Sequence, residues 1–409
     1  FPTADNRLQI TTTGGNIFIA GLGSFEPDDI STVDGSIDIE ADVNGSKLTI
    51  PSSGGGAGIR ATGNGNITLS SADDMFIEKF VQTANGDIFI DADSDDDGGG
   101  ELETTGSGDV SSTGGGTIDV TLAEVKFVGD FNTAGNLTFR QSRTSDTIGL
   151  GGIAGALDFS DTELSRFTAG TLEFGRTDGA DINLQSVTLS NVNTLVLLTG
   201  GTVDDDNGTD LTGVSALGIL AGGTVDLDTT IDSVAVVNSG TGGVNIADTA
   251  NGLNIITITT SVGDITGVNA TGGSVFLNAA GSNANADLDI SSDVINSSGQ
   301  ITLNAGESIL LSANVTAFGS NGITFNAGQS TSTGAFTMSG AASITGENGT
   351  IDINSDTDAT ITEIDTVNGR VDITATNGNI TVNAAAGGIV ATGTSDFTLV
   401  AGADVDLND

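Results

Sequence analysis

The sequence repeats one short phrase along most of its length: a glycine, then two branched or aromatic apolar residues two positions apart, with small polar residues between them. Examples are GGNIFIA from residue 14, NGNITLSS from 64, NGTIDINS from 348 and NGNITVNA from 377. Alternation with a period of two is typical of a β-strand, and Asn-Gly is a turn signal. The first apolar residues of successive phrases, such as Ile17, Ile37 and Ile67, lie 20 or 30 residues apart. The chain is therefore expected to be a repeat array of short strands.

Each repeat unit holds two or three short apolar segments separated by Gly, Asn, Asp or Ser corners, which is the pattern of one coil of a β-solenoid. A coil of about 20 residues cannot bury its own apolar face, so it must stack on its neighbours. We predict an all-β parallel β-solenoid that runs as one continuous domain over residues 1–409, with loop excursions near 91–103 and 202–210. Glycine is expected at the corners because it adopts positive φ at low cost.

Two other architectures are disfavoured by the pattern. No segment has a helical periodicity, so helices are not expected. A string of tandem β-sandwich domains would show one long period and aromatic core anchors, and neither is present. Ladders of Ile, Val, Leu and Phe are expected inside the coils, and ladders of Asn, Thr and Asp outside.

Charge and missing residue types limit the possible functions. The chain has 54 acidic and 10 basic residues, a formal charge of −44, and no His, Cys, Trp or Tyr. It should repel nucleic acid and anionic membranes, and attract cations. Without His or Cys there is no Ser-His-Asp triad, no cysteine nucleophile and no ordinary zinc site. No apolar run is long enough for membrane insertion.

The densest acidic stretch, DADSDDDGGGELE at residues 91–103, is a candidate metal site. Asp93, Asp95 and Asp97, followed by Gly98, match the first half of a calcium-binding loop, in which alternate carboxylates converge on one cation. The twelfth position falls on Thr104, which cannot chelate, so Glu101 is the expected substitute. We predict calcium bound by Asp93, Asp95, Asp97 and Glu101; the alternative is a solvated acidic loop.

A second acidic cluster, TVDDDNGTD at residues 202–210, is a weaker match to a metal-binding loop. It offers Asp204, Asp206 and Asp210 around an Asn-Gly pair, and it follows the apolar run LVLLTG. We interpret it as a turn that emerges from a buried strand.

The phrases GNITLSS at 65–71, GQITLNAGESILLSANVTAFG at 299–319 and GNITVNAAAGGIVATG at 378–393 resemble the repeats of filamentous-haemagglutinin-type bacterial adhesins and related giant β-strand-repeat surface proteins. The resemblance spans most of the chain and is best from about residue 260 onward. It implies a right-handed parallel β-helix on the outer surface of a bacterium. The secretion-domain motif that two-partner-secreted adhesins carry near the N-terminus is not evident here.

These observations together predict a structural or adhesive extracellular protein, the stiff shaft of a surface fibre, adhesin or surface layer, and not an enzyme. Because the repeat still runs at SDFTLVAGADVDLND, we expect a longer fibre, covalently continuous or assembled end to end or laterally, with a cell-surface or glycan ligand as a further partner. The alternative from another class is a carbohydrate-active β-helix enzyme, a polysaccharide lyase or hydrolase that uses paired carboxylates.

Overall fold

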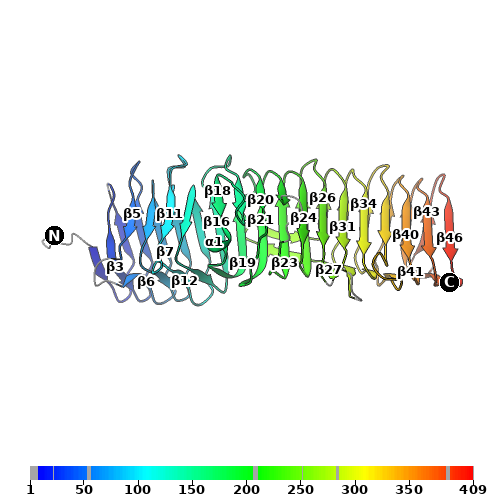
Figure 1. The fold of residues 1–409 in the computed structure, drawn as a ribbon, viewed down its shortest axis with the longest axis horizontal. Coiled ribbons are helices and arrows are strands. Elements are labelled where there is room, and N and C mark those ends of the chain that lie inside the picture. Colours follow the sequence, from blue (N-terminus) through cyan, green and yellow to red (C-terminus); the bar gives the residue numbers. More distant parts are fainter. Residues whose placement is uncertain are drawn as a thin grey trace. The chain divides into compact units, whose positions relative to one another are not determined.

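The computed structural model describes residues 8–21, 23–52, 57–205, 211–250, 252–281, 285–383 and 387–408. The chain divides into two compact units, Phe1–Thr199 and Gly200–Asp409. Each unit is a stack of short parallel strands (Figure 1). The predicted fold class, an all-β parallel β-solenoid, is confirmed within each unit. The prediction of one continuous domain stays a prediction.

The first unit contains 21 strands and one short helix among its described residues. Its elements are β1 (Leu8–Thr11), β2 (Ile17–Ala20), β3 (Pro27–Thr32), β4 (Ile37–Ala41), β5 (Leu48–Ile50), β6 (Gly58–Ala61), β7 (Ile67–Ser71), β8 (Met75–Ile77), β9 (Val81–Thr83), β10 (Ile88–Asp91), β11 (Glu101–Thr104), β12 (Val110–Ser112), β13 (Ile118–Leu122), β14 (Glu124–Phe127), β15 (Phe131–Thr133), β16 (Asn136–Gln141), β17 (Ile148–Leu150), β18 (Leu157–Phe159), α1 (Asp161–Leu164), β19 (Phe167–Gly175), β20 (Ile182–Leu184) and β21 (Val192–Leu198).

The second unit contains only strands among its described residues. They are β22 (Val203–Asp205), β23 (Ala216–Ala221), β24 (Val225–Thr229), β25 (Ser233–Asn238), β26 (Val244–Asp248), β27 (Gly252–Ile255), β28 (Thr257–Thr260), β29 (Gly263–Thr266), β30 (Val268–Ala270), β31 (Val275–Ala279), β32 (Asp287–Ile290), β33 (Val294–Asn296), β34 (Ile301–Ala305), β35 (Ile309–Leu311), β36 (Val315–Ala317), β37 (Ile323–Asn326), β38 (Phe336–Met338), β39 (Ile344–Gly346), β40 (Ile351–Ser355), β41 (Ala359–Ile361), β42 (Glu363–Thr366), β43 (Val371–Ala375), β44 (Ile380–Asn383), β45 (Gly388–Ala391), β46 (Phe397–Ala401) and β47 (Val405–Asn408).

A typical coil has three strands, one on each face of the stack. In the first unit β7, β8 and β9 form one coil, and each pairs in parallel with a strand of the next coil, β10, β11 and β12 respectively. Coil length varies: Ile118 pairs with Leu137, 19 residues later, and Leu137 pairs with Leu172, 35 residues later. The additional residues of the 35-residue coil include β18 and helix α1, and the strands on either side keep their register.

Alternation along each strand separates the interior from the surface. In β40 the burial pattern alternates strictly between buried and half-buried side chains, and Ile351 and Ile353 face inward. Register stacks like on like: Ile301, Ile323, Ile351 and Val371 form an interior ladder in the second unit. On the outer side the Asn326 amide donates to Asn304 Oδ1 (2.8 Å), as the predicted polar ladders require.

The repeated glycine has a different role from the one expected. Gly65 and Gly349, the glycines of two of the repeated phrases, do not have positive φ. A Cβ on Gly65 would lie 1.8 Å from the carbonyl oxygen of Gly35 in the preceding coil, and a Cβ on Gly349 would lie 2.0 Å from the carbonyl oxygen of Asn321. The expectation based on φ is therefore wrong at these positions. The corner needs glycine because neighbouring coils approach too closely for any side chain.

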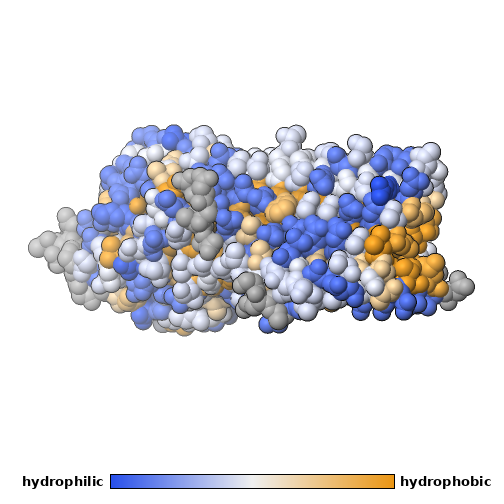
Figure 2. Space-filling view, turned by 45° about the vertical axis from the view of Figure 1, so that its right-hand side comes forward, coloured by the Kyte–Doolittle hydropathy of each residue, from blue (hydrophilic) through white to orange (hydrophobic). Residues whose placement is uncertain are grey.

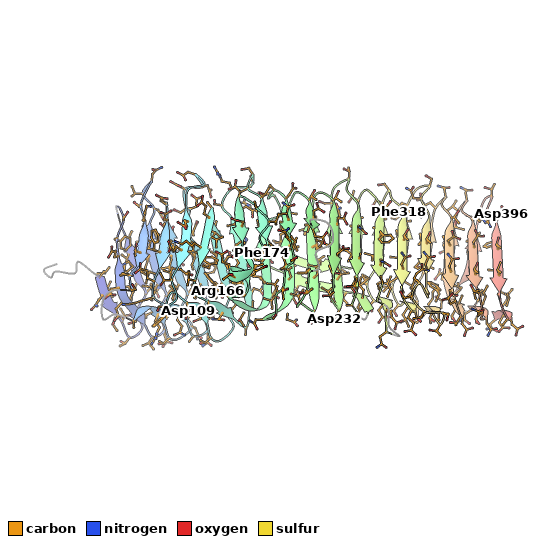
Figure 3. The ribbon with its side chains drawn as sticks, viewed as in Figure 1. Asp109, Arg166, Phe174, Asp232, Phe318 and Asp396 are labelled. Atoms are coloured by element: carbon orange, nitrogen blue, oxygen red, sulfur yellow. The ribbon has the colours of Figure 1, made fainter. Side chains whose placement is uncertain are left out.

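Aromatic residues gather inside the first unit. Six phenylalanine side chains, all buried, contact one another there: Phe127, Phe131, Phe139, Phe159, Phe167 and Phe174. Figure 3 labels Phe174 of this cluster and, in the second unit, Phe318, whose side chain is exposed. The cluster spans the 35-residue coil that joins β16 to β19.

Two short elements depart from the parallel coil. Helix α1 was not expected, and it begins with a capping box in which the Ser160 side chain and Glu163 satisfy each other's backbone N–H groups. Strands β28 and β29 form an antiparallel hairpin, and its Ile258 and Ile265 are buried.

Candidate functional site

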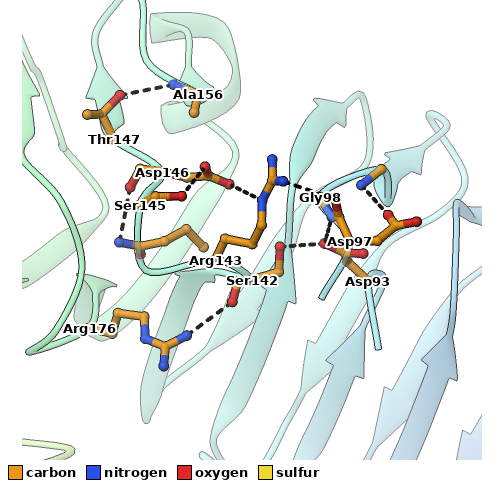
Figure 4. A network of polar contacts seen from close by, with 12 residues as sticks. Asp93, Asp97, Gly98, Ser142, Arg143, Ser145, Asp146, Thr147, Ala156 and Arg176 are labelled. Atoms are coloured by element: carbon orange, nitrogen blue, oxygen red, sulfur yellow. Dashed lines mark hydrogen bonds and ion pairs between the residues drawn. The ribbon is translucent and has the colours of Figure 1, made fainter. Parts of the chain in front are cut away.

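The acidic loop between β10 and β11 forms the candidate site, and we call residues 91–99 the acidic corner (Figure 4). Two residues with positive φ turn the chain back on itself, Asp96 (54°) and Gly98 (84°). The backbone N–H of Gly98 donates to Asp93 Oδ2 (3.0 Å), and that of Gly99 donates to Asp97 Oδ1 (2.9 Å). The turn thereby folds the alternate aspartates onto one another.

Three of the four predicted ligands meet in this corner. One carboxylate oxygen from each of Asp93, Asp95 and Asp97 lies within 4.8 Å of the others. Asp93 is fully buried, whereas Asp95 and Asp97 are exposed. Asp93 Oδ2 accepts hydrogen bonds from Gly98 and from the Ser142 hydroxyl. Asp93 Oδ1 is shielded from solvent and has no hydrogen-bond donor among the described residues.

The fourth predicted ligand, Glu101, does not join this group. It begins β11 and is absent from the set of carboxylates that lie within reach of one another among the described residues. Its backbone N–H donates to Asp74 Oδ1 (3.2 Å), and desolvation, followed by the neighbouring Glu103 carboxylate, raises its pKa. Thr104 is buried in the same strand. The pairing of β11 with its neighbouring strands therefore fixes Glu101 outside the group of three aspartates.

The acidic corner extends past the coil that follows it and contacts the coil after that one. The coil after it turns from β13 to β14 through a single residue, Ala123, whose N–H donates to Gly100 O (3.0 Å). Above that short turn the corner meets the residues that follow β16. The Ser142 hydroxyl donates to Asp93, and Arg143 Nη1 donates to the carbonyl oxygen of Asp97 (3.0 Å). On the other side Ser94 N–H donates to Ser71 O (3.0 Å).

The charge of the corner is not neutralised by a basic side chain. Arg143 is the nearest cation in Figure 4, but its guanidinium bonds a backbone carbonyl, and its Nε lies 3.4 Å from Asp146 Oδ2. Within the described part of the chain no Lys or Arg forms an ion pair with Asp93, Asp95 or Asp97.

Two carboxyl groups of the corner have raised pKa values, chiefly through desolvation and further through neighbouring carboxylates. Burial, with smaller effects from Asp96, Asp93 and Asp42, raises the pKa of Asp91 to about 6. Partial desolvation and the carboxylates of Asp97 and Asp93 raise the pKa of Asp95. Both shifts mean that the ionised corner is unfavourable without a nearby positive charge.

The second predicted cluster is only partly described. Asp204 lies on β22, a strand that pairs with β24, and Asp206 and Asp210 lie outside the described residues. Burial raises the pKa of the adjacent Asp205 to about 6, and its Oδ2 accepts from the Asp228 N–H (2.5 Å). The part of this cluster that is described belongs to a strand.

A shallow groove lies on the outer face of the sheet that contains β4, β7, β10, β13 and β16. Its volume is about 360 Å³, and Glu40, Phe89, Asp91, Asp119 and Arg140 line it. Arg140 forms ion pairs with Asp119 and, at 3.8 Å, with Glu173. The groove places carboxylates, one guanidinium and one aromatic ring on the same surface.

Sequence reasoning did not identify the partners of the acidic corner. Ser142 and Arg143 lie 49 and 46 residues from Asp93 and Asp97, and Asp42, which accepts from the Ser94 hydroxyl, lies 52 residues away in the other direction. No local motif marks them. The only signal that could have identified them is the exact number of residues in each intervening coil, because that number decides which residues meet at this corner.

Comparison of the chain with models of protein families, with curated proteins and with solved structures finds no match. None of the helices in the described residues has the length and apolar character needed to cross a membrane.

Proposed function

We propose that this protein is a structural or adhesive component of a bacterial cell surface, the stiff shaft of an extracellular fibre, adhesin or surface layer. The observation that carries the proposal is the long run of paired parallel strands in the second unit. In the second unit seven successive strands, β26, β31, β34, β37, β40, β43 and β46, pair in parallel without a break. Each coil is thereby hydrogen-bonded to two neighbours, which resists bending and unfolding.

The exterior suits a shaft in water. Polar ladders cover the outer positions of the strands, and the formal charge of −44 makes neighbouring molecules repel one another. The absence of His and Cys from the whole sequence leaves few groups for acid-base or nucleophilic chemistry. The resemblance of the repeated phrases to surface adhesins agrees with this function and with an extracellular location.

Immunogold electron microscopy of intact producing cells tests the proposal. Antibodies raised against the purified chain should label fibres or a layer outside the cell, in line with the proposed location. Labelling that requires permeabilised cells would refute the extracellular shaft. A binding screen of the same purified chain on a glycan panel distinguishes a shaft that also binds a ligand from one with a purely structural role.

Self-association is part of the proposal, and an apolar surface over the last described coil supports it (Figure 2). Val382, Ile389, Phe397, Leu399 and Leu407 line a hollow of about 360 Å³ there, and Leu407 is 69% exposed. Contact with a second copy would remove this apolar surface from water.

Sedimentation of Leu407→Asp against the parent chain tests self-association. We expect the parent chain to form larger species with increasing concentration and the variant to remain smaller. Val262→Asp, a change at another exposed aliphatic residue, in the loop of the β28–β29 hairpin, is the control. Equal sedimentation of the three proteins at every concentration would exclude this surface as the contact.

The alternative function, cleavage of a polysaccharide, is favoured by one observation, the groove with Glu40, Asp119 and Arg140. Glycosidases need two carboxylates and lyases need a base beside a group that neutralises the sugar acid. A reducing-sugar assay together with ultraviolet detection of unsaturated products, over a panel of neutral and acidic glycans, separates the two functions. If the parent chain released products and Arg140→Ala abolished that release, the enzyme function would be favoured and the shaft function rejected.

A further inference from the structure

The acidic corner contains an energetic conflict that the polypeptide alone does not resolve. Three carboxylates share a space less than 5 Å across, and the buried one has an oxygen without a hydrogen-bond donor. An unpaired buried carboxylate oxygen destabilises the folded state, because it has lost its water without gaining a hydrogen-bond donor. Like charges at this distance add to that cost. A cation between the three oxygens would remove both penalties.

We propose that Asp93, Asp95 and Asp97 bind one Ca²⁺ ion, with Asp93 Oδ1 as the buried ligand, and that the ion fastens the acidic corner to the coil that carries Ser142. The spacing fits this ion. Calcium binds oxygen at about 2.3–2.6 Å, so two ligands on opposite sides of it are separated by about 5 Å at most. The three carboxylate oxygens lie within 4.8 Å of one another.

The ligand types and exposure select calcium over other common divalent ions. The group offers only oxygen, which excludes the nitrogen and sulfur ligands that zinc prefers. Asp95 and Asp97 are exposed, so their side of the site is open for the water molecules that would complete six to eight ligands, about the number calcium takes. Magnesium demands a tighter octahedron at about 2.0–2.1 Å and keeps most of its own water.

The contacts around Asp93 connect the site to a second coil. One carboxylate oxygen of Asp93 accepts from Ser142 and Gly98, and the other is buried without a donor, so it is available to the proposed ion. Holding the Asp93 side chain therefore also holds Ser142, and the Arg143 bond to the Asp97 carbonyl adds a second connection. The ligand set differs from the one expected from the sequence, because Glu101 takes no part.

Calcium binding to the full chain, first freed of metal with a chelator, tests the site. Isothermal titration with CaCl₂ should show one site per chain that is stronger than the diffuse binding expected of an acidic surface. Asp95→Asn should weaken that site at least tenfold. Asp158→Asn, which removes an exposed carboxylate on β18 of the same unit, should leave it unchanged. Equal titration curves for the parent chain and Asp95→Asn would overturn the proposal.

Thermal unfolding provides a second test, because calcium binding should reverse the sign of the change in melting temperature caused by one substitution. A loop without a bound ion would show no such reversal. In chelator, Asp95→Asn should raise the melting temperature because it removes repulsion in the corner; in CaCl₂ it should lower it relative to the parent chain. Asp95 is exposed, so its substitution leaves the fold intact. Asp93→Asn should also abolish the calcium response. The same stabilisation by NaCl of equal ionic strength in all variants would show screening only and refute the site.

Hydrogen exchange tests whether the ion joins two coils. Added calcium should slow amide exchange both in residues 93–99 and in residues 142–146. Slower exchange in residues 93–99 alone would refute the fastening of the second coil.

Discussion

The two units use the same corner and the same register around different interiors. Twelve of the 17 phenylalanines and nine of the ten basic residues belong to residues 1–199. There the interior holds six contacting phenylalanine rings, whereas the ladders of the second unit are mainly aliphatic, with one phenylalanine pair, Phe325 and Phe336, among the described residues. The comparison suggests that backbone stacking at the corner is the common requirement, and that the interior is free to vary.

The units also differ in how they compensate charge. Among the described residues nine of the ten ion-pair contacts lie in the first unit, including the pair of Lys79 and Asp28 (3.1 Å), in which Asp28 is buried. The second unit has the contact between Arg370 and Asp372, two exposed or half-buried neighbours on one coil. The second unit instead buries Asp248 with three hydrogen-bond donors, from Thr229, Ile231 and Ala250.

The largest expected effect comes from the shared corner. Gly65→Ala and Gly349→Ala should each destabilise their own unit by about 4 kcal/mol or more, since the new Cβ meets the backbone of the preceding coil. Gly14→Ala is the control because no atom lies within 4 Å of its Cβ. Denaturant unfolding followed by hydrogen exchange in each unit measures the losses. A tolerated alanine at either repeated glycine would contradict a common corner.

The interior of the first unit should be the next most sensitive. Phe139→Ala should cost about 3–4 kcal/mol of unfolding free energy because it leaves a cavity among the five other rings. In the second unit Ile353→Val, a small change in an aliphatic ladder, should cost only about 1 kcal/mol. Denaturant midpoints of the two variants make the comparison. Equal losses would mean that the aromatic cluster is not a special feature of the first unit.

Removing a lysine should affect the first unit more than removing the arginine affects the second. Lys79→Ala should cost about 3 kcal/mol, because the buried Asp28 loses its positive partner. Arg370→Ala should cost less than about 0.5 kcal/mol, since that pair is largely exposed. Unfolding at low and high salt checks both values. If the Lys79 variant were as stable as the parent chain, the ion pair would not be structural.

A further expected difference is a pH dependence in the second unit. Burial raises the pKa of Asp248 to about 6, above its value of 3.8 in an unfolded chain. The folded state then binds more protons between these values, so the free energy of unfolding should fall as pH rises from about 4 to about 6, by up to about 3 kcal/mol for this group. Asp248→Asn should remove that part of the slope. An unchanged slope in the variant would show that Asp248 does not titrate in this range.

Much of the fold could be predicted because its signals are local. Ile351 and Ile353 alternate with polar residues, and that spacing alone places them on the inner side of a strand. The spacing of Asp93, Asp95 and Asp97 likewise predicted that their carboxylates converge. Glu101 lies outside this group of carboxylates because the start of β11 depends on pairing with Met75–Ile77 and Glu124–Phe127 in other coils.

The repeated phrase determines by itself that this chain forms short strands, that the apolar side of each strand faces inward, and that coils stack in register. Each of these follows from a period of two and a recurring glycine. Which corners meet was decided only by the tertiary structure. Asp93 reaches Ser142 because the intervening coil turns through Ala123 alone, and Gly65 is required by a carbonyl oxygen 30 residues earlier, at Gly35. Contacts of this kind depend on the summed length of whole coils, which no local pattern records.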